Sequence, residues 1–478
     1  MSGPLWTIGA VADAMRAARS GTLPEIATGL SIDSRTIAPG EAYFAIKGDV
    51  HDGHDFVEAA LKNGGGVAVI DEQHRDRFSG DLPLLIVPDV LAGLVDLARA
   101  SRARLQAKII AVTGSVGKTS TKEALRCVLQ DQGETHASAA SFNNHWGVPL
   151  SLARCPASAK FAIFEIGMNH AGEIEPLVKM VRPHIAIVTT VEPVHLEFFS
   201  GIEAIADAKA EIFTGVEPDG TAILNIDNSQ FARLRDKAKA AGISRIVSFG
   251  AADKADARLI DVALQPADSA VHADILGQHV AYKIGVPGRH IAVNSLAVLA
   301  AASLAGADLA LSALALTRFK PASGRGVRQI LEVESGTATL IDESYNANPA
   351  SMAAALNVLG QAELGARGRR IAVLGDMLEL GAAGGELHRG LGKAIEVNRI
   401  DAVFCCGPLM RYLWEALPSA KKGGYADTSA ALEPQVISAI GPGDAIMVKG
   451  SLGSRMKLIV TALEKRFPSK APLDDLTV

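Results

Sequence analysis

Apolar residues along the chain gather in short runs that end in glycine or polar residues and are followed by stretches with helical spacing. The clearest runs are "KIIAVTG", "FAIFEIG", "IAIVTTV" and "TAILNID", between about residues 107 and 322. Parallel strands joined by helices produce this pattern, because both faces of their sheet are covered. The pattern predicts a large central parallel sheet built from βαβ units.

Shorter segments of the same kind lie on both sides of this central part. Residues 1–106 contain the strand-like runs "AYFAI" and "VAVI" and the helical stretch "DFVEAALKNG". After "FKPASGRGVRQ" the pattern restarts, with "ATLIDES", "RIAVLGD", "AVFCCG" and "AIMVKG" as strand candidates. A chain of 478 residues is also too long for one core. We therefore predict an α/β protein of three domains: a small α/β N-terminal unit (1–106), a central parallel-sheet domain (107–322) and a C-terminal Rossmann-like domain (323–478).

Composition narrows the class of protein without naming a function. Hydrophobic residues make up 48% and charged residues 21% of the chain, and the formal net charge is -5. This charge provides no basic surface for nucleic acid, so we expect no nucleic-acid partner. The four cysteines lack metal-binding spacing, and the start of the chain has no signal-peptide pattern. No apolar run reaches the roughly 18 residues of a membrane span. These features predict a cytoplasmic protein that is not embedded in a membrane.

The stretch "AVTGSVGKTSTKEAL", residues 111–125, has the chemistry of a phosphate-binding turn. It follows a buried strand and opens a helix, whose free amides attract anions. Lys118 is placed to reach the terminal phosphates and Thr119 to offer its hydroxyl to Mg²⁺. The usual G-x-x-x-x-G-K-[ST] pattern fails at Val112, and a glycine-rich turn with a solvated lysine is the alternative. The predicted nucleotide contacts are Thr113, Gly114, Ser115, Val116, Gly117, Lys118, Thr119 and Ser120.

Further polar candidates follow the later strands of the predicted sheet. Glu165 ends the run "FAIFE", where a carboxylate is either a metal ligand or a hydrogen-bonded strand end. His195 follows the next strand, although a lone histidine is more often structural than a ligand. Lys209, in "DAKAEIF", has the alternative of a surface ion pair with Asp207 or Glu211. In open α/β sheets the ligand crevice lies at the carboxyl ends of the strands, where these residues fall.

Motifs spread over nearly the whole chain resemble those of the Mur ligase family, ATP-dependent enzymes that build the peptide of the bacterial cell-wall precursor. The opening loop has that family's shorter form, T-G-x-x-G-K-[ST], so the missing glycine is normal in it. The other matching stretches are "SIDSRTIAPGEAYFAIKG", "DGHDF", "SFNNHWGVPLSL", "FEIGMNHAGEI", "AKAEIF", "GRHIAVNSLAVLAA", "SGRGVRQ", "LIDESYNANPASM", "GDMLELG" and "VKGSLGSRM".

The resemblance implies ATP and Mg²⁺ as cofactors, with two Mg²⁺ ions, and a P-loop-type ATPase fold for the central domain. It implies that Lys118 and Thr119 hold the ATP phosphates and one ion, while Glu165 and His195 help to bind metal. Lys209 matches the lysine that is carbamylated in these ligases, which makes it a carboxylate-like ligand. The implied catalytic residues are Lys118, Lys209, His195 and Arg325, and the implied metal ligands are Thr119, Glu165, His195 and Lys209.

Around the nucleotide, Asn294 matches an adenine-contacting asparagine and Arg325 an arginine that reaches the phosphates from the last domain. Asp342 is implied to lie near the ribose, and Arg328 is a weaker candidate than Arg325. Each has an alternative, since an asparagine at the start of a helix is often only a cap and an arginine in a glycine-rich linker is often solvated.

For the other substrates, the resemblance makes the N-terminal unit the part that binds the UDP end, although Asp33 and Ser34 in "DSR" could equally form a local turn cap. The family commonly has an acid after the paired asparagines, where this chain has His145, so a role for an acid there is in doubt. The implied substrate contacts are Ser34, Arg35, Lys47, Gly48, Asn143, Asn144, Asn346, Asn348, Asp376, Lys449 and Ser451.

Within the family, "YNANP" and "GDMLELG" are most similar to the ligase that joins D-alanyl-D-alanine to UDP-N-acetylmuramoyl-tripeptide through an acyl phosphate. Its partners would be these small molecules, and we expect a monomer. The nearest rival adds the third amino acid, but its D-N-P-R signature is absent from this chain. Folate polyglutamate ligases lack a comparable N-terminal unit. A non-catalytic P-loop module would need neither the strand-end carboxylate nor Lys209.

Overall fold

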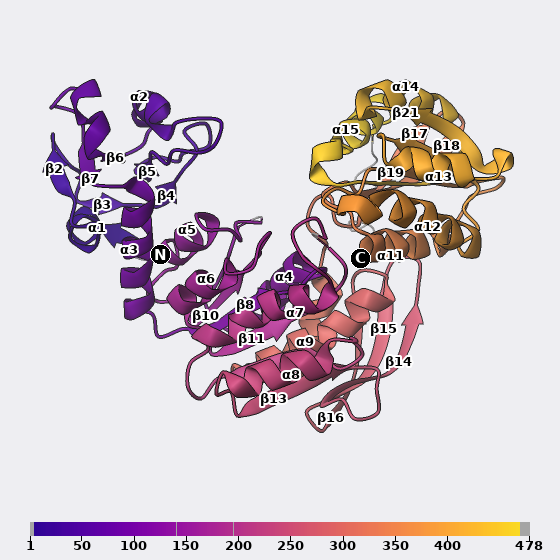
Figure 1. Ribbon diagram of the computed structural model, residues 1–478, viewed down its shortest axis with the longest axis horizontal. Helices are drawn as coiled ribbons and strands as arrows, with labels where there is room; N and C mark the ends of the chain where they lie inside the picture. Colours follow the sequence, from indigo (N-terminus) through magenta and orange to yellow (C-terminus); the bar gives the residue numbers. More distant parts are fainter. Residues whose placement is uncertain (1–3, 140, 195, 469–478) are drawn as a thin grey trace.

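The computed structural model of the chain describes residues 4–139, 141–194 and 196–468. Three α/β units follow one another along the chain, each built around its own main sheet. Figure 1 shows the N-terminal and C-terminal units above opposite ends of the central unit, with the chain running through all three in order. The α/β class and the three-unit order predicted from the sequence are confirmed.

The N-terminal unit has a five-stranded sheet in the order β2-β7-β6-β5-β4. Strands β4 to β7 pair in parallel, and β2 joins the edge antiparallel to β7. A further short pair, β1 with β3, is antiparallel. The elements of this unit are β1 (Trp6–Thr7), α1 (Ile8–Met15), β2 (Ala18–Ser20), β3 (Ile26–Ala27), β4 (Leu30–Ser31), β5 (Ala42–Phe44), η1 (Gly53–Phe56), α2 (Val57–Lys62), β6 (Val67–Asp71), η2 (Glu72–Arg77), β7 (Leu84–Val87) and α3 (Val90–Arg104).

The central unit has a nine-stranded sheet in the order β16-β15-β14-β13-β12-β11-β8-β10-β9. Strand β8 lies between β10 and β11, so the turn after β8 opens between the ends of two neighbouring strands. The strands are β8 (Lys108–Thr113), β9 (Thr135–Ala137), β10 (Phe161–Glu165), β11 (Ile185–Val188), β12 (Thr221–Asn225), β13 (Arg245–Gly250), β14 (Ala257–Leu264), β15 (Ser269–Ile275) and β16 (Gln278–Ile284). The helices are α4 (Lys118–Leu129), α5 (Gly147–Ala153), α6 (Ile174–Val181), α7 (Ile202–Ala210), η3 (Glu211–Gly215), α8 (Phe231–Ala240), α9 (Arg289–Leu304), α10 (Leu309–Ala315) and η4 (Leu316–Arg318).

The prediction of a parallel central sheet is wrong for its last two strands. Strands β14, β15 and β16 form an antiparallel meander at one end of the sheet. Residues Leu276 and Gly277 connect β15 to β16, and both have positive φ angles, 55° and 87°. Two such residues form the type of turn whose twist matches a hairpin. Buried and exposed residues alternate along β15, as expected for a strand with one covered face.

The C-terminal unit has a six-stranded sheet in the order β17-β18-β22-β19-β20-β21. All neighbours are parallel except β17, which was not among the predicted strands and which pairs antiparallel to β18. The elements are β17 (Val327–Val333), β18 (Gly336–Glu343), α11 (Pro349–Gly360), β19 (Arg370–Gly375), η5 (Gly381–Ala383), α12 (Gly384–Val397), β20 (Ala402–Cys406), α13 (Met410–Ala416), η6 (Ser419–Lys421), β21 (Lys422–Ala426), α14 (Ser429–Ala439), β22 (Ala445–Lys449), η7 (Leu452–Ser454) and α15 (Lys457–Arg466).

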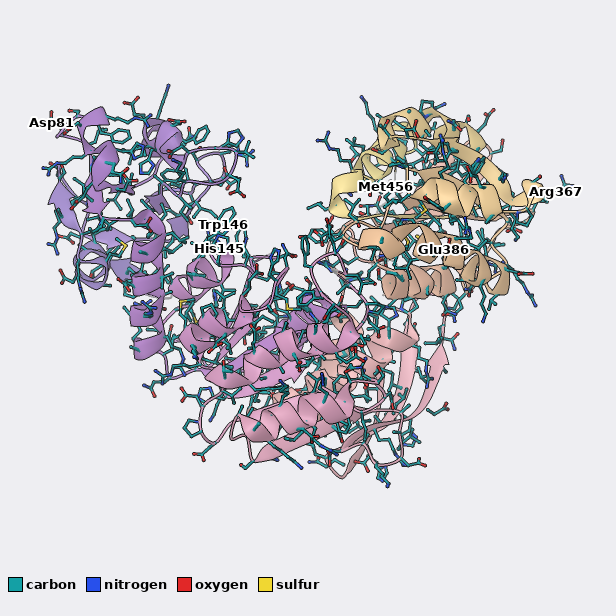
Figure 2. All side chains as sticks on the ribbon, viewed as in Figure 1. Asp81, His145, Trp146, Arg367, Glu386 and Met456 are labelled. Atoms are coloured by element: carbon teal, nitrogen blue, oxygen red, sulfur yellow. The ribbon has the colours of Figure 1, made fainter. Side chains whose placement is uncertain are left out.

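The first two units share a hydrophobic core, whereas the C-terminal unit has separate cores of its own. Buried hydrogen bonds reinforce the shared core: Trp6 Nε1 donates to the carbonyl of Ala153 at 2.8 Å, and Ser101 Oγ donates to that of Leu152 at 2.7 Å. Figure 2 shows His145 and Trp146 at the edge of the central unit nearest the N-terminal unit. Among the described helices, none has both the length and the apolar composition that crossing a bilayer requires.

Candidate active site

The turn between β8 and α4 has the backbone form of a phosphate-binding loop. Gly114 and Gly117 have φ angles of 145° and 89°, in a region that favours glycine. The hydroxyl of Thr189, just beyond β11, donates to the carbonyl of Val116 at 2.6 Å. The backbone N–H of Ser115 donates to the carbonyl of Thr190 at 2.8 Å. The ends of β8 and β11 therefore fix the loop, and the amino end of α4 faces its opening.

Lys118 is the first residue of α4, and its ammonium group folds back over the loop. Its Nζ donates to the carbonyl of Gly114 at 2.8 Å. Burial lowers the pKa of Lys118 below its ordinary value; the carboxylate of Glu165 opposes this effect, and the positive charge of Arg325 adds to it. Lys118 therefore lies in the electrostatic field of both a strand-end acid and an arginine from the junction with the C-terminal unit.

Glu165 ends β10 and is almost completely buried, with 1% of its surface exposed. Its two carboxylate oxygens each accept one hydrogen bond: Oε2 from the hydroxyl of Thr119 and Oε1 from the amide of Asn143, both at 2.8 Å. A carboxylate oxygen has a second lone pair, so both oxygens keep acceptor capacity next to the loop. The arrangement brings together Lys118, Thr119, Asn143 and Glu165 at one strand end, and provides hard oxygen ligands.

Lys209, on α7, has 2% of its surface exposed. Neither of the acids considered as its surface partner is available. The carboxylate of Glu211 accepts hydrogen bonds from backbone N–H groups at the start of α6, and Asp207 pairs with Arg233 and Lys237 at 3.3 and 3.2 Å. The ion-pair alternative is therefore wrong. Burial, reinforced by the charge of Lys118, lowers the pKa of Lys209 well below its ordinary value, which favours a neutral amine.

Arg325 and Asn294 approach the loop from different parts of the chain. The Arg325 guanidinium lies over the ring of Tyr345, 4.3 Å from its centroid, and its NH2 group donates to Ser141 Oγ at 3.4 Å. It is therefore held rather than freely solvated. Asn294 lies in the second turn of α9, whose N-cap is Gly288, so the capping alternative is wrong. A Cβ atom on Gly117 would lie 2.6 Å from Asn294 Nδ2, which places this amide against the loop.

Sequence comparisons match known proteins over most of the chain. Sequence models of the Mur ligase catalytic, middle and glutamate ligase domains match residues 27–98, 112–302 and 329–452. A UDP-N-acetylmuramoyl-tripeptide–D-alanyl-D-alanine ligase of Rickettsia prowazekii is 32% identical over 433 residues, 90% of this chain and 94% of the relative. The chain belongs to the Mur ligase family. As a family member it is an ATP-binding enzyme of the ligase class.

Solved structures of Mur ligases have the same architecture. MurF from Acinetobacter baumannii superposes with a TM-score of 0.82 at 29% identity, covering 96% of this chain and 99% of that one. MurF from Thermotoga maritima, solved in complex with ADP, gives a TM-score of 0.74 at 25% identity over 92% and 98% of the two chains. Both structures extend over all three units, so the likeness is not confined to the nucleotide loop.

In this Mur ligase the C-terminal candidates are engaged in holding their own loops. Asp342 accepts hydrogen bonds from Lys457 Nζ at 2.9 Å and from Ser344 Oγ. Lys449 Nζ donates to Glu343 at 3.0 Å and to the carbonyl of Asn346, also at 3.0 Å. Both Asp342 and Lys449 lie at carboxyl ends of strands of the C-terminal sheet.

The other candidates of the C-terminal unit also form hydrogen bonds within that unit. The side chain of Asn348 caps α11, where it accepts from the backbone N–H of Ser351 at 2.9 Å. Asp376 accepts from two backbone N–H groups at the start of α13, but burial prevails and raises the pKa of its carboxyl group. Ser451 Oγ accepts from the N–H of Leu378 at 3.0 Å. These contacts shape the edge of the sheet and leave the role of each side chain toward a substrate as a prediction.

The candidates of the N-terminal unit stand apart from the phosphate loop (Figure 1). The carboxylate of Asp33 accepts from the backbone N–H and the guanidinium of Arg35, which is the local turn considered as the alternative. Ser34 is buried, and its carbonyl accepts from Asn63 at 2.9 Å. The last two candidates begin the loop that connects β5 to η1: Lys47 forms a bridge with Asp52, and the N–H of Gly48 donates to the carbonyl of His51.

Four further residues from the sequence analysis either lie outside the described residues or have no contact there with the phosphate loop. His195 lies outside the described residues. Asn144 and His145 are exposed, so neither contacts Glu165 in the way that Asn143 does. Arg328 donates through NH1 to the carbonyl of Pro266, and burial lowers the pKa of its guanidinium. It is therefore directed at the backbone of the central unit and not at the loop.

Sequence reasoning missed the residues that hold the loop from behind. Thr189 and Thr190 follow the apolar run "IAIV", so the same strand-end argument that selected Glu165 could have found them. Tyr345, beneath Arg325, and Lys122, which donates from α4 to the carbonyl of Ser138 at 2.7 Å, had no comparable signal. Their roles depend on contacts between segments far apart in the sequence.

We predict that Gly114→Ala strongly weakens nucleotide binding. A Cβ atom at this position would lie 2.0 Å from Thr189 Oγ1, and the φ angle of 145° is strained for alanine. The loop and the end of β11 would have to separate, which misplaces the backbone amides that bind phosphate. Calorimetric titration with ADP and Mg²⁺ should show binding at least tenfold weaker. Gly172→Ala is the matched control, because Gly172 also has a positive φ angle but open space around it; equal ADP affinity in wild type and Gly114→Ala would contradict the prediction.

Proposed function

We propose that this chain is the ATP-dependent ligase that joins D-alanyl-D-alanine to UDP-N-acetylmuramoyl-tripeptide. The single observation that carries the proposal is the similarity to ligases of this name over 90% of the chain. The middle-domain match, residues 112–302, contains the Lys118, Thr119 and Glu165 cluster. Its tripeptide substrate presents a carboxylate and its dipeptide substrate an amine, two groups that do not condense in water without activation. The phosphate loop supplies the means of activation.

We propose that two Mg²⁺ ions accompany ATP, and the donor set around the loop fits them. Glu165 retains free lone pairs on both oxygens, and the Thr119 hydroxyl is the usual P-loop ligand. His195 is assigned to the same ligand set. When bound, the ions neutralise the crowded phosphate oxygens, as in other phosphoryl transfers. In every case the ligand residues come from the central unit.

Lys209 fits this set as a carbamate. A neutral amine reacts with CO₂: the nitrogen forms a bond to the carbon, a proton passes to water, and the side chain changes from a base to an anion. The lowered pKa of Lys209 keeps the amine neutral, and the acids near it are occupied by other groups. Carbamylation would also place a negative charge near Lys118, whereas a protonated Lys209 would be repelled by it. Without this reaction, burying the Lys209 amine would cost free energy of folding and would give the group no function in the site.

The reaction then has two balanced steps. A carboxylate oxygen of the tripeptide attacks the γ-phosphorus of ATP, the bond to the β,γ-bridging oxygen breaks, and ADP leaves. The amine of D-alanyl-D-alanine attacks the acyl carbon, the bond to the phosphate oxygen breaks, and phosphate and a proton leave. Lys118 and Arg325 provide positive charge where the γ-phosphate oxygens gather. Asn294 is assigned to the adenine and Asp342 to the ribose.

We assign the three units to the three substrates: residues 1–106 to the UDP end, 107–322 to ATP, and 323–478 to the dipeptide. Because the first two units share a core, we expect them to move together, with the C-terminal unit closing over the loop. Gly324 and Gly326, with φ angles of 74° and 100°, lie at the junction where this rotation would occur. The chain works as a monomer in this scheme, since one chain supplies every candidate residue, and four free buried cysteines agree with the cytoplasm.

A phosphate-release assay with substrate omission tests the proposal. We expect sustained phosphate release from ATP only when UDP-N-acetylmuramoyl-tripeptide and D-alanyl-D-alanine are both present. Sustained release without D-alanyl-D-alanine would contradict the proposal. Sustained release with UDP-N-acetylmuramoyl-dipeptide and a single diamino acid, in place of the two proposed substrates, would instead assign the chain to another reaction of the family.

A further inference from the structure

Two aspartate–histidine pairs face each other in the N-terminal unit, outside the candidate active site. Asp52 caps η1, accepts from the N–H of His54 at 3.0 Å and lies 2.6 Å from Nδ1 of the same histidine. Asp71 caps η2 and stands in the same relation to His74, at 3.0 and 2.7 Å. The two imidazole rings are stacked, with centroids 3.8 Å apart and 11° between their planes. Turn capping explains each pair but not their packing against each other.

The hydrogen bonds fix which nitrogen atoms are free. His54 Nε2 accepts from the backbone N–H of Asp71 at 3.2 Å, so its Nδ1 carries the proton and donates to Asp52. His74 donates through Nδ1 to Asp71, which leaves its Nε2 with a lone pair. That Nε2 lies 3.6 Å from Asp52 Oδ2, and neither atom has a hydrogen bond to another of the described residues. Two atoms with unshared lone pairs therefore lie 3.6 Å apart.

The separation of 3.6 Å is too long for a hydrogen bond, so a proton between the two atoms would be poorly held. The same separation suits two atoms that bind one metal ion. Zinc binds imidazole nitrogen and carboxylate oxygen at about 2.0–2.2 Å, and two ligands about 2.1 Å from one ion and 3.6 Å apart subtend about 118° at it, close to the tetrahedral angle. Asp52, His54 and His74 also form the one group of His, Cys, Asp and Glu side chains in the described residues whose ligand atoms gather closely enough to hold a metal ion.

The surroundings favour a cation. The cluster contains two carboxylates, on side chains that are only 21% and 19% exposed. Arg77, on the same turn as His74, pairs instead with Asp55 at 2.7 Å. Metal-binding histidines normally donate their other N–H to a carboxylate, as His74 does to Asp71.

We propose that Asp52 Oδ2 and His74 Nε2 bind a divalent transition metal ion of the zinc class. Asp71 and His54 hold these two ligands in position through their hydrogen bonds, and water completes the coordination. The ion would tie the loop of residues 47–52, which the Lys47–Asp52 bridge closes, to η2, which follows β6.

Zinc titration of the full chain tests this inference, with a chromophoric chelator as competitor and excess Mg²⁺ to occupy oxygen-ligand sites. We expect wild type to bind one Zn²⁺ that His74→Ala and Asp52→Asn each weaken at least tenfold, and that Asp71→Asn weakens by about tenfold. His279→Ala is the matched control, because His279 forms an exposed pair with Asp274 at 3.9 Å, and it should leave the affinity unchanged.

A second readout does not depend on the stability of the variants. Zn²⁺ should slow amide hydrogen exchange in residues 47–53 of wild type and of His279→Ala, but not of His74→Ala. Equal zinc affinity in wild type and His74→Ala, or no slowing of exchange in this loop of wild type at saturating Zn²⁺, would overturn the site. Neither result bears on the ligase reaction, which is assayed separately.

Discussion

Lys118→Ala should lower kcat/KM for ATP by about a hundredfold to a thousandfold, the loss typical when one preorganised charge at a transferring group is removed. Its Nζ sits over the loop, bonded to the carbonyl of Gly114, within the fields of Glu165 and Arg325. Arriving phosphate oxygens would replace that carbonyl as the acceptor. Steady-state phosphate release with all three substrates measures the effect.

Lys108→Ala is the matched control for Lys118→Ala. Lys108 starts β8, on the strand that leads into the loop, but its side chain is exposed and remote from the turn. We expect its variant to keep the wild-type rate and the wild-type fold by circular dichroism. A folded Lys118→Ala enzyme with unchanged kcat/KM would show that the loop does not bind the transferring phosphate.

Lys209→Ala should reduce turnover strongly, and short carboxylates such as acetate or formate should restore part of it. The variant opens a small cavity beside the loop, in which an added carboxylate can take the place of the carbamate oxygens. We expect a loss of about a hundredfold, comparable to removing one electrostatic group from a catalytic site. The rate should be followed as phosphate release over a range of acetate concentrations.

Lys237→Ala serves as the control for Lys209→Ala, since Lys237 is half exposed on α8 and pairs with Asp207. It should keep the wild-type rate and show no response to acetate. A Lys209→Ala enzyme as fast as wild type would exclude the carbamate. If Lys209→Ala is slow and acetate does not restore its rate, then carboxylate oxygens cannot replace the function of Lys209. That result would also contradict the proposal.

Lys209→Ala should also change how the free energy of unfolding depends on pH. The pKa of Lys209 is lowered in the folded chain, so between that value and the ordinary lysine pKa of 10.5 the unfolded chain binds one more proton than the folded chain. The free energy of unfolding therefore rises with pH in this window, by up to about 1.4 kcal/mol per pH unit from this group. Urea unfolding across this range should show a shallower rise in Lys209→Ala than in wild type.

The parts of the site that are contiguous in sequence were predictable, and the parts built from distant segments were not. The loop around Lys118 and the strand-end position of Glu165 follow from local patterns, because the strand, the turn and the helix are adjacent in the chain. The partner of Asp342 is Lys457, more than a hundred residues away, and no local pattern encodes that pair. The roles assigned to the individual side chains stay predictions.

The fold shows the same division between local and long-range information. Apolar runs located ten of the 22 strands in the described residues, each with a neighbouring strand on both sides, because burial on both faces leaves a clear signal. The antiparallel end of the central sheet was missed, although the Leu276–Gly277 turn and the alternation along β15 contained its signal. Strand β17 was missed for a different reason: it lies at the edge of its sheet, where burial is incomplete and the pattern is weak.

Activation of the tripeptide carboxylate by ATP is the central claim, and oxygen labelling tests it most directly. The terminal carboxylate of the tripeptide is labelled with ¹⁸O, and the released phosphate is analysed by mass spectrometry after turnover with ATP and D-alanyl-D-alanine. An acyl phosphate leaves its bridging oxygen with phosphorus, so we predict one ¹⁸O atom in each phosphate released. Unlabelled phosphate, formed together with the amide product, would contradict the claim.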